Sequence, residues 1–419
     1  MTINSDRWFP IQTATSCRSK WGWSTIWLNF GKTGSCCVAS ISDIGDDFDN
    51  FHNTEKKLKA RELMLQGQWP GDGCESCKSI EQFGGFSDRQ FQNSIPNIYP
   101  RELDHDATAI RVEPAVLEVY FSNACNLRCV YCTANLSSAI QAENTKFSGA
   151  ILPNTEFEFK HNQYRDQQSR FWTWFEAHGQ NLQRLQVAGG EPFLQKDVHT
   201  LIKQFETASY PDLEFNIITN LSLKSDVVLP QLNDLATHVN NKKIKQVDIQ
   251  ASIDCWGDQQ VYVRDGIDLD QFDINMKNML NLDKFRVGLL STVNSLSIIA
   301  MPELLKKWKS WNQINTVHWY MHLVRPSDSV FSPLIFRYQL FESALHDMIT
   351  GLPEETWDHR VTKNTLLGIK SQLQQQCVNN IDRQRDLYQF LKENDRRRNL
   401  NWQKTFPWLL EELERNNVV

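Results

Sequence analysis

Three cysteines in one short loop constrain this chain more than any other feature. Cys125, Cys129 and Cys132 are separated by three and then two residues, directly after the apolar run 117–121. Thiolates at this spacing can face one point from a single loop, which suits an iron–sulfur cluster better than a disulfide. Three thiolates hold three corners of a cubane cluster and leave the fourth iron open. An open coordination position is where a metal site does chemistry.

A glycine-rich turn follows the second predicted strand, with the letters Gly189-Gly190-Glu191-Pro192 after Ala188. Glycines let the backbone approach a ligand closely, and Glu191 supplies a carboxylate that can bind an ammonium group. The alternative is a plain strand–helix turn.

Together these motifs resemble those of the radical S-adenosylmethionine enzymes. The cysteine motif has an aromatic residue, Tyr131, before its last cysteine, and all four letters of the family's Gly-Gly-Glu-Pro motif are present. A zinc knuckle or a chance cluster is the alternative for the cysteines. In the family, the open iron of a 4Fe–4S cluster chelates S-adenosylmethionine. One electron then cleaves the cofactor to a 5′-deoxyadenosyl radical, which removes hydrogen from the substrate.

The resemblance also implies residues around this cofactor. The Gly189–Pro192 motif would contact its amino group, Arg264 its carboxylate, and Ser252 its ribose. Asp254 and Thr219 are further candidates for ribose contacts. For Arg264, Ser252, Asp254 and Thr219 the alternative is ordinary helix capping or core filling. The implied cofactor-binding set is Tyr131, Gly189, Gly190, Glu191, Pro192, Thr219, Ser252, Asp254 and Arg264.

Cys255 follows the fourth predicted strand, near the expected substrate position. By the same resemblance its thiol would return a hydrogen atom to a substrate radical, as in some epimerases of the family. The alternative is a small buried hydrophobic side chain.

The first hundred residues hold five of the ten cysteines. A predicted strand–turn–strand hairpin brings Cys17 near Cys36, and Cys74 and Cys77 form a later C-x2-C turn, so four sulfurs can close a tetrahedral or cubane site. A four-cysteine zinc site is one interpretation. The other is a second 4Fe–4S cluster, because the spacing resembles the SPASM and twitch auxiliary modules. Those modules usually follow the catalytic domain, whereas here the cysteines precede it, and Cys37 is an alternative to Cys36.

Alternating apolar and amphipathic runs predict an α/β fold with parallel strands. The six predicted strands are 117–121, 184–188, 213–218, 246–253, 284–292 and 315–324. The resemblance implies that they form a partial (β/α)6 TIM-like barrel. The predicted domains are an N-terminal auxiliary-cluster module at 1–105, the barrel at 106–334, and a C-terminal helical extension at 335–419.

Composition narrows the functional classes. The chain of 419 residues has a net charge of −6, which makes nucleic-acid binding an unlikely function. The sequence shows neither an apolar run of membrane-spanning length nor the apolar segment of a signal peptide, so we expect a cytoplasmic protein without membrane association. In that reducing compartment, cysteines are more often metal ligands than disulfide partners.

Relatives with auxiliary modules mostly modify peptides or proteins, so the resemblance implies oxidation, crosslinking or epimerisation of a peptide or protein side chain. A small substrate such as a sugar or nucleotide is the first alternative. A non-catalytic zinc- or cluster-binding interaction protein is the second. The enzyme would take electrons from an external flavodoxin- or ferredoxin-like donor.

Overall fold

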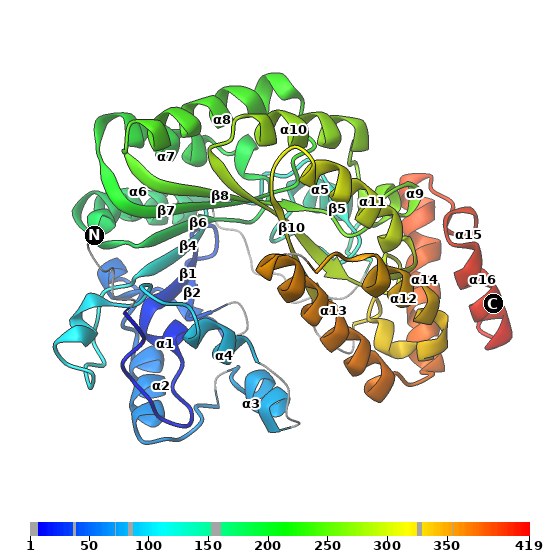
Figure 1. The fold of residues 1–419 in the computed structure, drawn as a ribbon, viewed down its shortest axis with the longest axis horizontal. Helices are drawn as coiled ribbons and strands as arrows, with labels where there is room; N and C mark the ends of the chain where they lie inside the picture. The colour runs from blue at the N-terminus through cyan, green and yellow to red at the C-terminus, as the bar shows by residue number, and fades with distance from the viewer. Residues whose placement is uncertain are drawn as a thin grey trace. The chain divides into compact units, whose positions relative to one another are not determined.

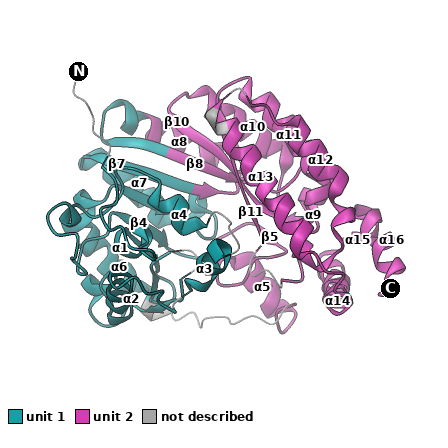
Figure 2. Cartoon of the chain, turned by 60° about the horizontal axis from the view of Figure 1, so that its bottom comes forward, with its two compact units in different colours: residues 1–123, 157–217, 237–247 teal, residues 124–156, 218–236, 248–419 magenta. Residues whose placement is uncertain are grey.

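The structure is a computed structural model. It describes residues 7–36, 39–71, 73–82, 87–151, 161–324, 329–354 and 356–419. The chain forms two compact units whose segments alternate along the sequence (Figure 2). Unit 1 comprises Met1–Asn123, Phe157–Ile217 and Thr237–Val247, and unit 2 comprises Ala124–Glu156, Ile218–Ala236 and Asp248–Val419. This division does not follow the three predicted domain ranges, which stay a prediction.

Unit 1 is built on parallel strands. Three of them are β4 (Val116–Tyr120), β6 (Arg184–Val187) and β7 (Tyr210–Thr219), and β4 pairs in parallel with β6, as β6 does with β7. Four of the five residues of β4 are buried, as expected for a strand covered on both faces. The strand order in this unit is β8 (Ile244–Ser252), β7, β6, β4, β1 (Trp23–Trp27), β2 (Lys32–Gly34) and β3 (Ser42–Asp43).

The predicted N-terminal hairpin is present and is joined to the parallel strands. Strand β1 (Trp23–Trp27) pairs antiparallel with β2 (Lys32–Gly34), which pairs with β3 (Ser42–Asp43). On its other edge β1 pairs in parallel with β4, residue for residue. The segment that carries the N-terminal cysteines therefore extends the sheet of β4.

Unit 2 contains the remaining parallel strands. The order is β11-β10-β8, with bounds Ile244–Ser252 for β8, Phe285–Val293 for β10 and Val317–Leu323 for β11. The strands β7 and β8 each contribute residues to both units. All six predicted strands thus exist, which confirms the α/β class. In neither unit do the described strands close into a barrel.

Helices connect and cover these strands (Figure 1). Those of unit 1 are α1 (Arg18–Gly22), α2 (Glu55–Leu65), α3 (Glu75–Gln82), α4 (Asp88–Asn93), α6 (His161–His178) and α7 (Lys196–Thr207). In unit 2 they are α5 (Ser138–Lys146), α9 (Asp258–Val263), α10 (Leu269–Asn281), α11 (Met301–Asn312), α12 (Glu342–Gly351), α13 (Trp357–Gln376), α14 (Ile381–Arg398), α15 (Trp402–Thr405) and α16 (Pro407–Arg415). Helix α8 (Ser225–Asn240) contributes residues to both units.

The C-terminal region is helical, as predicted. Helix α13 packs against β11, and α12 packs against both α11 and α13. A buried run of Trp402, Phe406, Leu409 and Leu413 faces inward, as expected of amphipathic helices that cover a core.

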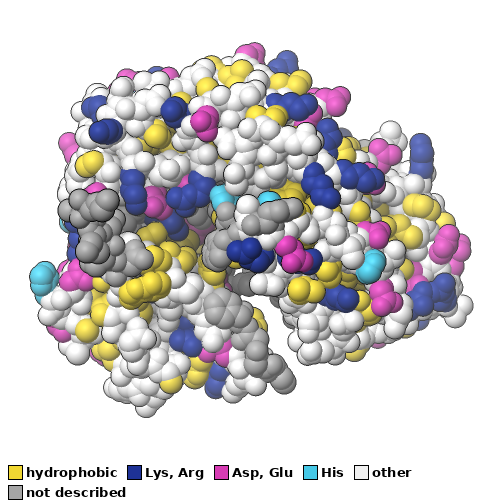
Figure 3. Space-filling model, in the orientation of Figure 1, with side chains coloured by type: hydrophobic (Ala, Val, Ile, Leu, Met, Phe, Trp, Pro, Cys, Tyr) yellow, Lys and Arg dark blue, Asp and Glu magenta, His cyan; other side chains and the backbone are white. Residues whose placement is uncertain are grey.

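Helix hydrophobicity and surface charge relate to the predictions made from composition. No helix in the described part of the chain is long and apolar enough to cross a lipid bilayer. On the face shown in Figure 3, Lys and Arg side chains of the described residues are interspersed with Asp and Glu.

Candidate functional site

The loop that carries Cys125, Cys129 and Cys132 belongs to unit 2, where a short ladder holds it. Strand β5 (Arg128–Cys129) pairs antiparallel with β9 (Arg264–Asp265), and Cys129 lies opposite Arg264. The amide of Val130 donates to the carbonyl of Val263 over 2.9 Å. The predicted cofactor residue Arg264 is thus the strand partner of a predicted cluster ligand.

Further hydrogen bonds fix the start of the loop. The amide of Cys125 donates to Ser138 Oγ over 3.1 Å, and Ser137, which caps α5, donates to the carbonyl of Leu127 over 2.7 Å. The amide group of Asn220 donates to Asn126 Oδ1 over 2.8 Å. The backbone course of the loop is therefore set by protein contacts on several sides.

The thiols of the loop are partly buried and influence one another. Burial raises the pKa of Cys132, and the neighbouring Cys129 and Cys125 raise it further. Burial also raises the pKa of Cys129, while the charge of Arg264 opposes that shift. These three soft donors are the ligand type that iron–sulfur clusters require.

Within the described residues, no three His, Cys, Asp or Glu side chains form a group that could hold a metal ion. A site of that kind has several side chains that converge on one metal ion. In a cubane each thiolate binds a different iron at a corner of the cube, so the thiols do not converge on one ion.

Asp254 is the centre of a buried network beside this loop. Its side chain is fully buried and accepts two hydrogen bonds from Arg264, each of 3.0 Å. It also accepts from the hydroxyl of Tyr131 over 2.5 Å and from the amide of Thr292 over 2.9 Å. The Coulombic attraction of Asp254 raises the pKa of Arg264 against the effect of burial. Three predicted cofactor residues thus contact one another directly.

The other predicted residues of unit 2 lie at the ends of strands. Ser252 is buried at the end of β8, and Thr219 Oγ1 accepts a hydrogen bond from the amide of Leu221 over 2.9 Å. Cys255 is fully buried, and its amide and thiol both lie against Oε1 of Gln260, at 2.9 and 3.5 Å. Burial, reinforced by Asp254, raises the pKa of this thiol well above its ordinary value.

The Gly-Gly-Glu-Pro turn belongs to unit 1 and follows β6. Gly189 and Gly190 have φ of +76° and +58°, and a Cβ at Gly189 would lie 2.1 Å from the ring of Tyr120. Glu191 is fully buried and caps the 3-10 turn Pro192–Leu194 by accepting from the amide of Phe193. The turn therefore gives Glu191 a structural task in addition to the role that the resemblance implies.

The four N-terminal cysteines of the predicted auxiliary site are all in unit 1. Cys17 precedes α1, Cys36 follows β2, and Cys74 and Cys77 lie at the start of α3. Cys17 and Cys74 belong to one buried cluster, and burial together with the nearby Cys36 raises the pKa of Cys17 to about 12. Cys37, the alternative ligand, lies outside the described residues.

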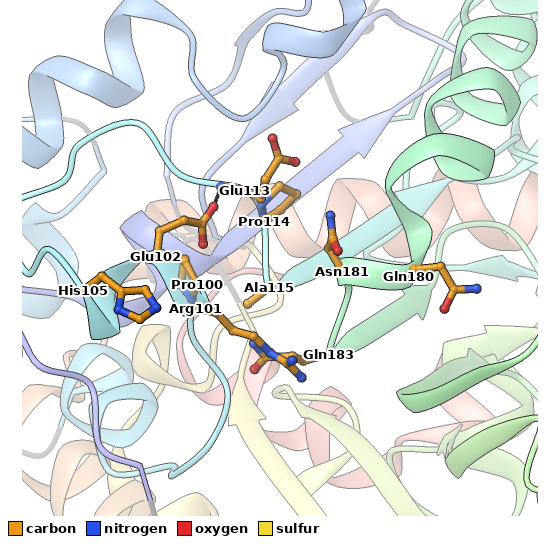
Figure 4. A pocket seen from close by; sticks show the side chains of 10 residues that line it. All are labelled: Pro100, Arg101, Glu102, His105, Glu113, Pro114, Ala115, Gln180, Asn181 and Gln183. Atoms are coloured by element: carbon orange, nitrogen blue, oxygen red, sulfur yellow. Dashed lines mark hydrogen bonds between the residues drawn. The ribbon is translucent and has the colours of Figure 1, made fainter.

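A cavity of about 340 Å³ lies where β4 and β6 begin (Figure 4). The Gly189–Pro192 turn, in contrast, follows the end of β6. Glu102 and Glu113 line one side and Gln180 and Asn181 another. None of the predicted site residues lines it.

Sequence reasoning did not identify several residues that shape the cysteine loop. Asn126 and Asn220 are polar residues at a loop and a strand end, a weak signal on its own. Arg398 was part of the run 396–398, which a sequence alone assigns to a solvated helix face. Its side chain is instead 3% exposed and pairs with Glu143.

Comparisons with known proteins give distant matches. No family model matches the chain, and no curated protein does. Streptococcus suis SuiB bound to the precursor peptide SuiA has 16% identity and a TM-score of 0.38, covering 70% of this chain and 63% of that one. SuiB bound to S-adenosylmethionine has 15% identity and a TM-score of 0.35, covering 78% of this chain and 69% of that one. TYW1 with a lysine–pyruvate adduct has 15% identity and a TM-score of 0.26, covering 50% and 63%.

The chain thus spans less than two thirds of the length of the peptide-bound SuiB chain. With every TM-score below 0.5, these likenesses do not decide fold, family or substrate.

Proposed function

We propose that this protein is a radical S-adenosylmethionine enzyme. The observation that carries the proposal is the cysteine loop. Its three thiols have the family spacing, and the loop is held in place through the pairing of Cys129 with Arg264. The second motif, Gly189–Pro192, adds a left-handed glycine turn that leaves no room for a side chain at its first position.

In this proposal Cys125, Cys129 and Cys132 hold a 4Fe–4S cluster. When bound, the cluster supplies the electron that cleaves S-adenosylmethionine and so generates the radical that abstracts hydrogen from the substrate. The role of the chain's own residues is to bind the cluster and to orient its ligands. The hydrogen bonds that the loop makes with Ser137, Ser138 and Asn220 hold its backbone, as a rigid cluster site requires.

The cofactor-binding residues that we propose are those of the glycine turn, Gly189, Gly190, Glu191 and Pro192, together with Tyr131, Thr219, Ser252, Asp254 and Arg264. The implied contact of Arg264 with the cofactor carboxylate would compete with its ion pair to Asp254. Because that pair is bidentate and buried, we propose that Asp254 orients Arg264.

A second 4Fe–4S cluster is proposed at Cys17, Cys36, Cys74 and Cys77, with zinc as the alternative. The partly buried ion pair Arg89–Glu81 lies in this region, and the thiols of Cys17 and Cys77 contribute to raising the pKa of Arg89. A neighbouring cation favours the thiolate form in either kind of metal site, so metal analysis must separate the two.

For the substrate we propose a peptide or protein side chain, on the resemblance of the N-terminal cysteines to auxiliary modules of peptide-modifying enzymes. The distant likeness to a peptide-bound structure does not carry this choice. A small molecule such as a sugar or nucleotide is the second candidate, and a role without turnover is the third. A short precursor peptide encoded beside this gene would support the first candidate if the reduced enzyme changed its mass or the chirality of one of its residues. An unchanged peptide would favour the small-molecule candidate instead.

The test of the main proposal is anaerobic reconstitution with iron and sulfide. We expect about eight iron atoms per chain for two cubane clusters. We also expect an electron paramagnetic resonance signal that changes when S-adenosylmethionine is added, and 5′-deoxyadenosine after reduction. Protein without iron, or a signal indifferent to the cofactor, would contradict the proposal. Zinc retained by the N-terminal cysteines would contradict only the auxiliary cluster.

A further inference from the structure

The last turn of α14 contacts the strand that carries Cys129. Arg398 donates from Nε and one terminal nitrogen to the two oxygens of Glu143, each over 2.9 Å. Its other terminal nitrogen donates to the backbone carbonyl of Arg128 over 2.7 Å. The Arg398 and Glu143 side chains are 3% and 4% exposed. This carbonyl belongs to the peptide bond that leads into Cys129, so the contact acts on the backbone of the cysteine loop.

The same helical turn also holds the opposite strand of the ladder. Asp395, three residues before Arg398, accepts a hydrogen bond from the hydroxyl of Tyr262 over 2.7 Å. Tyr262 lies at the end of α9, just before β9. Its ring packs edge-on against Phe406, with centroids 5.0 Å apart. Helix α14 is thereby tied to both β5 and β9.

Charges within the ladder complete the arrangement. Arg128 pairs with Asp265 over 2.7 Å across the two strands, and Arg398 lies 3.8 Å from the same carboxylate. Two arginines and two carboxylates therefore form one network, which compensates the buried charges of Arg398 and Glu143.

We propose that Arg398 is a positioning residue for the cysteine loop, which it fixes from the C-terminal helical region. The loop's role as a cluster site rests on the proposed function, whereas the contacts of Arg398 do not. A guanidinium is needed because one planar group must serve Glu143 and the Arg128 carbonyl together. A lysine carries its donors on one nitrogen and cannot reproduce this planar fork.

Helix α14 supplies a matched control on the same turn. The Arg396 side chain is 60% exposed and pairs with Glu393, within its own helix. Arg396→Ala removes a charge from the same helix end, a larger change than Arg398→Lys, without touching residues 125–132. The test variant is Arg398→Lys, which keeps the charge and removes the fork. Glu143→Gln is a second test variant, which removes the carboxylate partner.

The first experiment is amide hydrogen exchange on the full chain without metal. The reporters are the amide of Val130, bonded to Val263, and that of Cys132, bonded to the carbonyl of Cys129. Arg398→Lys and Glu143→Gln should accelerate exchange in 125–132 at least tenfold relative to β10 and β11, with Arg396→Ala unchanged. Exchange in 125–132 at the wild-type rate in both variants would overturn the proposal. Acceleration spread equally over β10 and β11 would overturn it too, since that marks general destabilisation.

The second experiment uses reconstituted protein and separates this proposal from the proposed function. At equal iron content, the signal of the reduced Arg398→Lys cluster should differ in shape from that of wild type, because the strand that carries Cys129 is held less firmly. An identical signal would overturn the positioning role. If wild-type protein takes up no iron, the proposed function fails while the exchange result still decides the role of Arg398.

Discussion

Asp254 and Arg264 form a buried, two-pronged ion pair beside the cysteine loop, with both nitrogen–oxygen distances at 3.0 Å. The Asp254 side chain is fully buried and that of Arg264 is 9% exposed. Because Arg264 is the strand partner of Cys129, this pair connects the end of β8 to the loop. Loss of either partner would leave an uncompensated charge in the protein interior.

The first prediction concerns this pair. Asp254→Asn keeps the size of the side chain but leaves the Arg264 charge buried without its counter-ion. We expect the free energy of unfolding to fall by about 3 kcal/mol, the scale of a broken buried ion pair. Denaturant unfolding of the metal-free chain measures it. Asp382→Asn, at a carboxylate that is 89% exposed, is the control and should be nearly neutral. A loss no larger than that of the control would remove Asp254 from the centre of the network.

The second prediction tests the catalytic cluster. Cys129→Ala removes one of three proposed thiolate ligands, so the variant should lose about four iron atoms per chain and all cleavage of S-adenosylmethionine. Iron analysis and 5′-deoxyadenosine assay measure this. Cys377→Ala is the matched control, because that thiol lies in the C-terminal region against the carbonyl of Pro333. 5′-Deoxyadenosine formed by reduced Cys129→Ala protein would refute the assignment.

The third prediction separates the N-terminal cysteines from the catalytic loop. Cys74→Ala should lower the iron content by about four atoms while cofactor cleavage persists, because Cys74 and the loop belong to different units. Product formation should stop if the auxiliary cluster takes part in turnover. Normal product yield from this variant would leave that cluster without a role in catalysis.

The fourth prediction concerns the glycine turn. Gly189→Ala places a methyl group against Tyr120, whose ring stacks on Trp27 at 5.3 Å and cannot easily move aside. Gly67 has a similar φ of +72° with open space around it, so Gly67→Ala measures the backbone strain alone. We expect about 1 kcal/mol for Gly67→Ala. Gly189→Ala should cost about 1–3 kcal/mol more, from overpacking. Equal losses in thermal or denaturant unfolding would show that Tyr120 yields.

The fifth prediction is a pH dependence at Glu118, in the middle of β4. Burial raises the pKa of this carboxyl above its ordinary value of 4.5, although hydrogen bonds from Thr25 and Gln186 oppose the shift. The folded state then holds a proton that the unfolded state has lost. Stability from this group is complete below pH 4.5 and falls as the pH rises through the folded pKa.

Glu118→Gln keeps the shape and cannot ionise. Its unfolding free energy should therefore decline less than that of wild type as the pH rises above 4.5 toward neutrality, in a series of denaturant titrations. Parallel profiles for the two proteins would mean that Glu118 stays ionised in the fold.

Local patterns in the sequence determined the strands and the candidate ligands. Alternation of apolar and amphipathic runs identified β4, β6, β7, β8, β10 and β11, because burial on both faces demands continuous apolar residues. The motif spacings identified the cysteine loop and the glycine turn, because both depend on residues within a few positions of each other.

Only the tertiary structure decided which distant residues hold the loop. Asp254, Arg264 and Thr292 meet because strand ends and the β5–β9 ladder bring them together. Arg398 reaches Arg128 from 270 residues away in the chain. Nothing in a run of three arginines distinguishes the buried side chains of Arg397 and Arg398 from the exposed side chain of Arg396. That distinction arises from helix packing, which sets the free energy of burying each charge and depends on partners that local sequence does not contain.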